Sequence, residues 1–202
     1  AGADLPQAVA LANIAASIVV GKLGTATVSG PELRRAVQQD QGSERGAVTL
    51  EQLQIAVADA RSQGEKVVFT NGCFDIIHAG HITYLEEARQ QGDRLIVAVN
   101  SDESVRRLKG KGRPINPAER RMAVLAGLEA VDWVVCFTDD TPRELLQVLQ
   151  PDVLVKGGDY ADKEAVVGWE IVEAYGGEVK VLGVVDDLST TAIVSRIQQG
   201  ES

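Results

Sequence analysis

Beyond residue 66, short aliphatic runs alternate five times with stretches that carry apolar residues at helical spacing. The runs are predicted strands at residues 67–70, 94–100, 133–137, 153–156 and 178–182. Such nearly continuous apolar sequence is typical of parallel strands that are buried on both faces. Parallel strands need crossover connections, and the helical stretches supply them. The alternation therefore predicts an α/β fold, a doubly wound five-stranded parallel sheet with helices on both faces.

The helical stretches begin at capping sequences. Thr49-Leu50-Glu51-Gln52 has the pattern of a capping box and predicts a helix to residue 63. Pro117 and Pro142 are expected at the first position of their helices, where a missing N–H has no cost. The second of these helices is expected to end at residue 149. Further helices are predicted at residues 79–91, 102–108, 163–175 and 190–198.

The first 46 residues differ in character from the rest of the chain. Residues 4–21 carry Ala, Leu, Ile and Val at helical spacing, which predicts an Ala-rich helix that packs on its own domain or on a second subunit. A short strand at residues 26–28 and a helix to residue 39 are expected next. Residues 40–46 are polar and Gly-rich, as linkers are. We therefore expect a mainly helical appendage over residues 1–46 and a separate domain over residues 47–202.

Polar clusters follow four of the predicted strands directly. They are Thr70-Asn71-Gly72, Asn100-Ser101-Asp102, Thr138-Asp139-Asp140 and Lys156-Gly157-Gly158-Asp159. Doubly wound parallel sheets bind their ligands beyond the carboxyl ends of the strands, in the crevice where the strand order reverses. We therefore expect all four clusters to lie along one edge of the sheet and to contribute to a binding site there.

The chain has only two histidines, His78 and His81, and both lie close behind the first strand of the alternation. Three residues apart, they share one side of a helical turn, so both imidazoles can face one ligand. The N-terminus of the following helix adds N–H groups and a positive dipole end, which suits a phosphate. The alternatives are a pair of core histidines or a metal pair, but no third ligand follows at zinc-site spacing. The glycine fingerprint of dinucleotide-binding sites is also absent here, which counts against a dehydrogenase.

Neighbouring residues add to this prediction. Gly72 and Gly80 lack a Cβ and let a ligand or a second backbone approach closely. The carboxylate of Asp75 would repel a phosphate, so we expect it to brace the turn by accepting backbone N–H groups. The loop at residues 109–113 is either a solvated basic stretch or a clamp for an incoming phosphate. It carries three cations separated by glycines, namely Lys109, Lys111 and Arg113.

Composition excludes some classes of protein. The formal net charge of -9 argues against a general nucleic-acid binder, which needs basic surface to replace counterions. No apolar run approaches the roughly 20 residues that cross a bilayer, and no N-terminal stretch has the parts of a signal peptide. Cys73 and Cys136 lack metal-ligand spacing and are expected to be reduced thiols in a cytoplasmic protein.

The run Gly72-Cys73-Phe74-Asp75-Ile76-Ile77-His78-Ala79-Gly80-His81 matches, position for position, the GxFDxxHxGH signature of the cytidylyltransferase-like nucleotidyltransferase superfamily. The likeness extends over residues 66–199. Residues 156–160 resemble the family's second nucleotide loop, and residues 188–193 are similar to its SSTxI motif. The resemblance implies a Rossmann-like nucleotidyltransferase whose nucleotide-binding residues here are Thr70, Asn71, Gly72, Cys73, Phe74, Asp75, Gly80, Lys156, Gly157, Asp159, Ser189, Thr190 and Thr191.

Within the superfamily the chain most resembles the adenylyltransferase half of bifunctional heptose-phosphate kinases and heptose 1-phosphate adenylyltransferases. The likeness rests on several further phrases, such as R-P-I-N-P at residues 113–117 and L-V-K-G-G-D-Y at residues 154–160. It implies that ATP, with Mg²⁺, and a sugar 1-phosphate are the substrates, and that no metal site is built from the protein alone. The implied catalytic residues are His78, His81 and Lys109, and the acceptor phosphate is expected at Lys109, Lys111 and Arg113.

The first forty residues resemble the last helix and strand of a ribokinase-like sugar kinase, without that fold's catalytic-base motif. No kinase activity is therefore expected from this chain. Three other functions remain open. They are a cytidylyltransferase that acts on glycerol 3-phosphate or a related alcohol phosphate, a non-catalytic nucleotide-sensing or assembly domain, and a zinc-dependent hydrolase. A homo-oligomer is compatible with the Ala-rich first helix.

Overall fold

The computed structural model describes residues 45–158 and 162–183, together with residues 9, 12, 13, 15, 16, 19, 20 and 27–30. Contacts divide the chain into two compact units, Ala1–Glu44 and Arg45–Ser202. In the first unit the described residues between 9 and 20 are helical, as predicted. Thr27 and Val28 are not in a strand, so the strand expected at residues 26–28 is wrong at these two positions.

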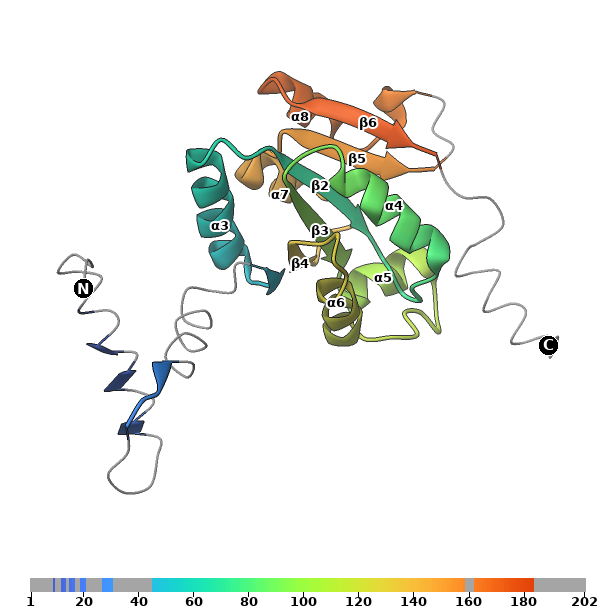
Figure 1. The fold of residues 1–202 in the computed structure, drawn as a ribbon. Coiled ribbons are helices and arrows are strands. Elements are labelled where there is room, and N and C mark those ends of the chain that lie inside the picture. The colour runs from blue at the N-terminus through green and yellow to red at the C-terminus, as the bar shows by residue number, and fades with distance from the viewer. Residues whose placement is uncertain are drawn as a thin grey trace. The chain divides into compact units, whose positions relative to one another are not determined.

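The second unit is built on a six-stranded sheet with the strand order β1-β4-β3-β2-β5-β6. All neighbouring strands are parallel, and Figure 1 shows the sheet with its helices. The strands are β1 (Gly46–Ala47), β2 (Val67–Gly72), β3 (Arg94–Asn100), β4 (Trp133–Phe137), β5 (Val153–Gly157) and β6 (Glu178–Leu182). The helices are α3 (Leu50–Ser62), α4 (Ala79–Arg89), α5 (Asp102–Lys109), α6 (Ala118–Ala126), α7 (Arg143–Leu149), α8 (Trp169–Ala174) and the 3-10 helix η1 (Lys163–Ala165).

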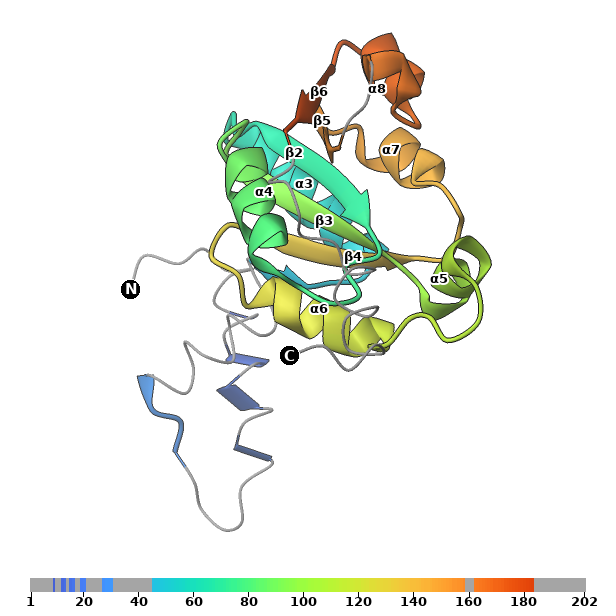
Figure 2. The same cartoon turned by 90° about the vertical axis from the view of Figure 1, so that its right-hand side faces the viewer.

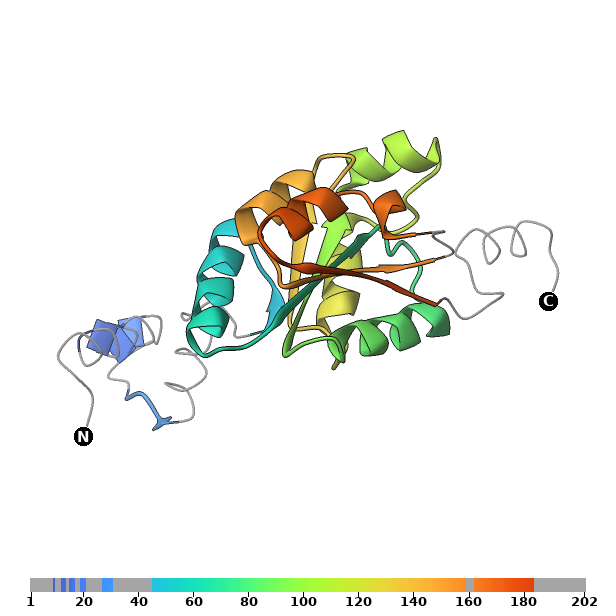
Figure 3. The same ribbon diagram turned by 90° about the horizontal axis from the view of Figure 1, so that it is seen from above.

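Helices cover both faces of this sheet because side chains alternate along each strand. On β3, Leu95 and Val97 pack into the cluster that contains Leu85 of α4 and Leu125 of α6. Ile96 lies in the other cluster, with residues of α3, α7 and α8. Figures 2 and 3 show these two helical layers on opposite sides of the sheet. All five named side chains have 0% exposure, and each such burial contributes about 1.5–3 kcal/mol. The predicted α/β fold is therefore confirmed.

The expectation of five strands is wrong by one, because a further strand, β1, begins at Gly46, the last residue of the predicted linker. The N–H of Gly46 donates to the oxygen of Asp132 at 2.6 Å, and the N–H of Val48 donates to that of Val134 at 2.9 Å. These bonds add the short strand β1 to the edge of β4. A two-residue strand that contains glycine has no apolar run, so the sequence pattern gave no sign of it.

Two predictions about helices also need correction. The helix expected at residues 163–175 is divided into η1 and α8 at Gly168, where φ is 91°. A Cβ at Gly168 would lie only 2.4 Å from Cδ1 of Leu146, so the chain passes this side chain too closely for any other residue. Pro117 and Pro142 are N-cap residues and do not occupy the first helical position. The helix predicted at residues 190–198 lies outside the described residues.

The order of the strands reverses beside β2. From β2 the chain proceeds to β3 and β4 on one side, and then crosses to β5 and β6 on the other side. This reversal creates a switch point between the carboxyl ends of β2 and β5, where open α/β sheets bind ligands. Within the part of the chain that the structure describes, none of the helices has the length and apolar character that a membrane crossing requires.

Candidate active site

The candidate site lies at the switch point between β2 and β5. Lys156 of β5 reaches across this point, and its Nζ donates a hydrogen bond of 2.8 Å to the backbone oxygen of Asn71 on β2. The ends of β3 and β4 continue the same edge, since the N–H of Ser101 donates to the oxygen of Phe137 at 2.8 Å. The described members of the four polar clusters therefore lie along one edge, as predicted. Asp159 lies outside the described residues.

A tight turn at residues 72–78 connects β2 to α4. Phe74 has a φ of 46°, in the left-handed region, and its ring covers Gly72. A Cβ at Gly72 would lie 3.0 Å from Cε2 of Phe74, so the missing side chain of this glycine makes room for the ring of Phe74. Gly80 is buried in the first turn of α4. The turn delivers His78 as the N-cap of that helix, with no hydrogen bond from its side chain to the helix.

The imidazoles of His78 and His81 stack on each other. Their ring centroids are 3.8 Å apart and their planes are inclined by 28°. The ring of Phe74 lies against His81, with 5.3 Å between centroids. The spacing of three residues therefore places both imidazoles on one side of the turn, as predicted.

Burial favours the neutral form of both imidazoles. It lowers the pKa of His78, and burial together with repulsion by His78 lowers the pKa of His81 to about 4. A neutral imidazole has one N–H and one lone pair. Each ring can therefore donate a single hydrogen bond, without acting as a charged acid at neutral pH.

Three buried polar atoms around the turn have no hydrogen-bond partner among the described residues. They are Nδ1 of His78, Nδ1 of His81 and Oδ1 of Asn71. A buried polar atom without a partner costs about 1–3 kcal/mol. A pair of core histidines would find partners within the fold. The unsatisfied atoms therefore favour a site that a polar ligand completes.

Lys156 supplies a positive charge next to this turn. Burial lowers the pKa of Lys156 to about 8. Its ammonium has three N–H donors, and the bond to Asn71 uses one of them. A cation held in this way can face an anion at the switch point.

Asp75 holds a loop that lies about forty residues further along the chain. Its carboxylate accepts the backbone N–H groups of Ile115 and Asn116, at 2.8 and 2.9 Å, and Nε of Arg113 at 2.6 Å. Burial opposes the charge of Asp75, but these hydrogen bonds outweigh burial and lower its pKa. Asp75 thus accepts backbone N–H groups, as expected, but those of the loop before α6 and not those of its own turn.

The basic loop lies near the histidine turn. Lys109 and Lys111 are exposed, while the guanidinium of Arg113 is engaged with Asp75. Burial raises the pKa of the Cys73 thiol, and the charges of Lys109, Arg121 and Arg113 oppose that rise. The bond of 2.6 Å from Nε of Arg113 to Oδ2 of Asp75 holds the end of this loop against the turn. The structure brings together the two regions that the sequence indicated.

Arg121 was not predicted as part of this site. It is only 2% exposed. Its side chain donates hydrogen bonds of 2.6 Å to the oxygen of Cys73, 2.9 Å to the oxygen of Asn116 and 2.8 Å to Oδ1 of Asp102. It thereby joins the histidine turn, the loop before α6 and the start of α5. The sequence did contain a signal for this role of Arg121. Arg121 lies four positions before Leu125, on the apolar face of a predicted helix, and a charged side chain that is buried on such a face requires partners.

Tyr84 of α4 was also missed. Its hydroxyl lies 2.7 Å from Oγ1 of Thr70, which is fully buried beneath the turn. A tyrosine on the inner side of a helix carries a polar group that needs a partner. That requirement was the available signal, but it could not identify Thr70.

Ser189, Thr190 and Thr191 lie outside the described residues, like Asp159. In the part of the chain that the structure describes, no three His, Cys, Asp or Glu side chains gather so that they could hold a metal ion. A zinc-dependent hydrolase would therefore find no ligand set in that part of the chain.

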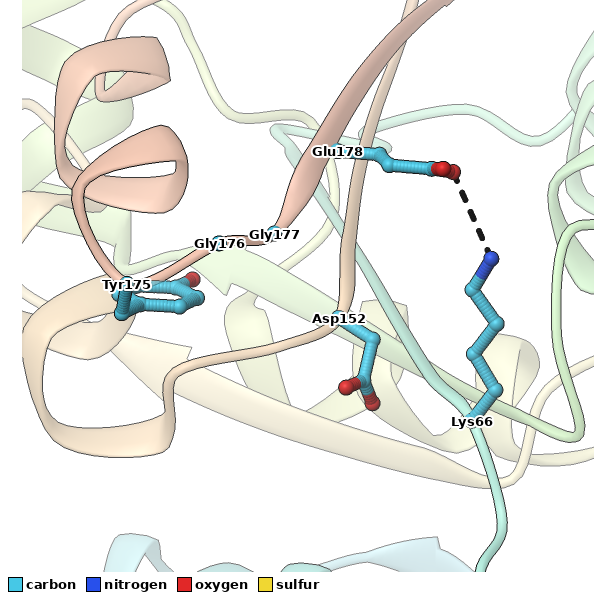
Figure 4. A pocket seen from close by; sticks show the side chains of 6 residues that line it. All are labelled: Lys66, Asp152, Tyr175, Gly176, Gly177 and Glu178. Carbon is cyan, nitrogen blue, oxygen red and sulfur yellow. Dashed lines mark hydrogen bonds and ion pairs between the residues drawn. The ribbon is translucent and has the colours of Figure 1, made fainter.

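A pocket of about 310 Å³ lies at the opposite edge of the sheet (Figure 4). Its lining residues are Lys66, Asp152, Tyr175, Gly176, Gly177 and Glu178. Glu178 is the first residue of β6, so the pocket lies at the amino ends of the strands. Lys66 and Glu178 face each other, with 3.4 Å between Nζ and Oε2. Asp152 and Glu178 place two carboxylates in this pocket. Open α/β sheets bind their ligands at the other edge, so this pocket is unsuited to a nucleotide.

The sequence model of cytidylyltransferase-like proteins matches residues 69–196. The chain belongs to this family. This cytidylyltransferase-like chain is 71% identical over 201 residues to the bifunctional protein HldE of Hahella chejuensis, a match over 100% of the chain. It is also 71% identical over 199 residues, 98% of the chain, to that of Pseudomonas aeruginosa. Each match covers 42% of the relative, so the chain spans about two fifths of the length of the curated relatives it matches.

The chain is similar to solved structures of other proteins. The lipopolysaccharide core biosynthesis protein from Thermoplasma volcanium is 31% identical, with a TM-score of 0.51, over 62% of this chain and 100% of that one. A pantoate-beta-alanine ligase from Francisella tularensis, in complex with beta-gamma ATP and beta-alanine, is 15% identical. Its TM-score is 0.52, over 78% of each chain, and at that identity it shows the shared fold alone.

Proposed function

We propose that the chain transfers AMP from ATP to a sugar 1-phosphate, D-glycero-β-D-manno-heptose 1-phosphate, and releases pyrophosphate. The observation that carries the proposal is the stacked pair of His78 and His81, whose buried Nδ1 atoms lack partners at the start of α4. Membership of the cytidylyltransferase-like family supports nucleotidyl transfer. The resemblance to heptose 1-phosphate adenylyltransferases and the 71% identity to HldE proteins support the choice of substrates.

The reaction requires positioning and charge stabilisation more than acid–base chemistry. An oxygen of the sugar 1-phosphate attacks the α-phosphorus of ATP in line, and the bond from that phosphorus to the bridging oxygen breaks. The electron pair leaves with pyrophosphate. Both reacting groups are already anionic, so no proton has to move. Preorganised hydrogen-bond donors and cations then provide the rate enhancement.

The residues at the switch point fit these needs. The neutral imidazoles of His78 and His81 each donate one hydrogen bond, to the α-phosphate and to the bridging oxygen. The N-terminus of α4 adds the positive end of its dipole. The ammonium of Lys156 neutralises negative charge from the β5 side. The other proposed nucleotide-binding residues are Asn71, Gly72, Cys73, Phe74, Asp75, Gly80, Gly157, Asp159, Ser189, Thr190 and Thr191.

The acceptor phosphate is assigned to the basic loop. Lys109 and Lys111 are exposed, and their charges are free to meet an anion. Arg113 is paired with Asp75, so its proposed contribution combines contact with the phosphate and anchoring of the loop. The substrate on the nucleotide side is the Mg²⁺ complex of ATP. Mg²⁺ binds mainly through phosphates and water, so few protein ligands are needed.

A matrix of nucleotides and phosphates tests the proposal. Pyrophosphate release is measured with ATP or CTP against heptose 1-phosphate, glucose 1-phosphate and glycerol 3-phosphate. We expect release with ATP and heptose 1-phosphate. Release with CTP and glycerol 3-phosphate alone would instead identify a cytidylyltransferase. Tight nucleotide binding without release in any combination would identify a nucleotide-sensing domain.

A further inference from the structure

The hydroxyl of Tyr84 links the two strands that flank the switch point. Its oxygen lies 2.7 Å from Oγ1 of Thr70 on β2 and 3.2 Å from the backbone oxygen of Val155 on β5. Thr70 has 0% exposure. A single phenol group from α4 therefore connects the strand before the histidine turn to the strand that carries Lys156.

The protons of this link can be counted. The hydroxyls of tyrosine and threonine carry one proton each. The backbone oxygen of Val155 can only accept, so Tyr84 donates its proton there. When Tyr84 donates to Val155, its oxygen can accept the proton of Thr70 at 2.7 Å. In this arrangement Thr70 has no proton left for a phosphate oxygen, and its remaining lone pairs would repel one.

The ring of Tyr84 also limits how β5 can approach β2. A Cβ at Gly157 would lie 2.8 Å from Cε2 and 2.9 Å from Cδ2 of this ring, closer than real Cβ atoms come. Gly157 therefore rests directly on the ring. Lys156, the preceding residue, donates to the oxygen of Asn71 across the gap. The position of the Lys156 ammonium thus depends on where Tyr84 holds the end of β5.

We propose that Thr70 and Tyr84 are positioning residues. Thr70 acts through Tyr84 to fix residues 156–158 against the histidine turn, and its hydroxyl does not touch the phosphates of the nucleotide. The proposal rests on the proposed nucleotidyl transfer and assigns the pair to the ATP half of that site. Such support matters because a displacement of about 1 Å can cost 10²-fold in rate.

A double-mutant cycle tests the proposal in the 202-residue chain. Thr70→Val, Tyr84→Phe and the double variant are compared with the wild type for ATP binding, measured by calorimetry with Mg²⁺ and without sugar phosphate. Each single change should raise the ATP dissociation constant about five- to tenfold, the effect of one lost hydrogen bond. The double variant should bind ATP as Tyr84→Phe alone does, with no further loss, because Tyr84→Phe already removes the bond to Thr70 together with that to Val155. In turnover, the KM for ATP should rise, while that for the sugar phosphate stays unchanged.

Tyr175→Phe is the matched control. The hydroxyl of Tyr175 donates to the backbone oxygen of Pro151 at 3.0 Å, and the residue lines the pocket at the opposite edge (Figure 4). This variant also loses one bond from a tyrosine to the backbone. Its melting temperature should therefore fall as that of Tyr84→Phe does, but its ATP dissociation constant should not change.

Two results would overturn the proposal. If Thr70→Val weakens ATP binding by the same factor in the wild type and in the Tyr84→Phe background, Thr70 contacts the nucleotide directly. If Tyr84→Phe binds ATP as Tyr175→Phe does, the link is only structural. Failure of the proposed function looks different. If the wild-type chain binds ATP but releases no pyrophosphate, the proposed function fails, and the double-mutant cycle still tests the roles of Thr70 and Tyr84. If the wild-type chain binds no ATP, both the proposed function and the positioning roles are overturned.

Discussion

The ammonium of Lys156 lies 2.8 Å from the backbone oxygen of Asn71, so β5 holds a cation against the turn that carries the histidines. Burial lowers the pKa of Lys156 to about 8. A lysine is charged below its pKa, so this cation is present below about pH 8 and is lost above it. ATP affinity should therefore fall as the pH rises through about 8. Calorimetry over a pH series measures this.

Two variants identify the group that titrates. Lys156→Arg keeps the charge to much higher pH, since the guanidinium pKa is above about 12, so the fall in affinity should move out of the measured range. Lys156→Met should bind ATP weakly at every pH and show no fall near pH 8. A fall near pH 8 that persists in Lys156→Met would mean that another group is responsible.

His81→Ala tests the role of the stacked pair. Losing one preorganised donor costs about 2.7–4 kcal/mol in a transition state, so turnover should slow by roughly a hundredfold or more. The fold should remain intact, because His81 makes no hydrogen bond through its buried Nδ1 to the described residues. Stopped assays of pyrophosphate release measure turnover, and circular dichroism checks the fold. Near-normal turnover would contradict the assigned role.

Lys109→Met tests the acceptor side. Lys109 is exposed and its charge acts on Cys73 of the turn. We expect the KM for the sugar 1-phosphate to rise about tenfold, as for the loss of a charged hydrogen bond, with little change in the KM for ATP. Lys163→Met is the control, because Lys163 is an exposed lysine of η1 that pairs with Glu173. Equal effects of the two changes would show that only overall charge matters.

The strands could be predicted from the sequence because their signal is local. Those at residues 94–100, 133–137 and 178–182 have the predicted bounds, since each reads as a run of mainly apolar residues. The histidine pair followed from the same kind of reasoning, because a spacing of three fixes the side of a helical turn. Parallel strands then placed the polar clusters at one edge.

What could not be predicted depends on partners that lie far apart in the sequence. β1 exists because Asp132 and Val134 supply acceptors about 86 residues away. Gly168 breaks a helix because of a side chain on α7, and the partners of Asp75 lie in a loop about forty residues further on. Each of these contacts requires the folded sheet. The sequence pattern indicates which residues carry chemistry, while the fold decides which of them meet.

Arg121→Met tests whether the buried guanidinium holds the site together. The change removes the side-chain donor from the oxygens of Cys73 and Asn116, while Oδ1 of Asp102 loses the guanidinium and keeps the N–H of Ala118. We expect the free energy of unfolding to fall by about 2–4 kcal/mol, between the cost of one unsatisfied acceptor and that of a broken buried ion pair.

Arg120→Met, at the exposed neighbouring position, is the control and should change the free energy of unfolding by less than about 0.5 kcal/mol. Urea unfolding followed by the fluorescence of Trp133 and Trp169 measures both, because these two tryptophans lie in the second unit. Equal stability of the two variants would show that Arg121 does not hold these three segments together.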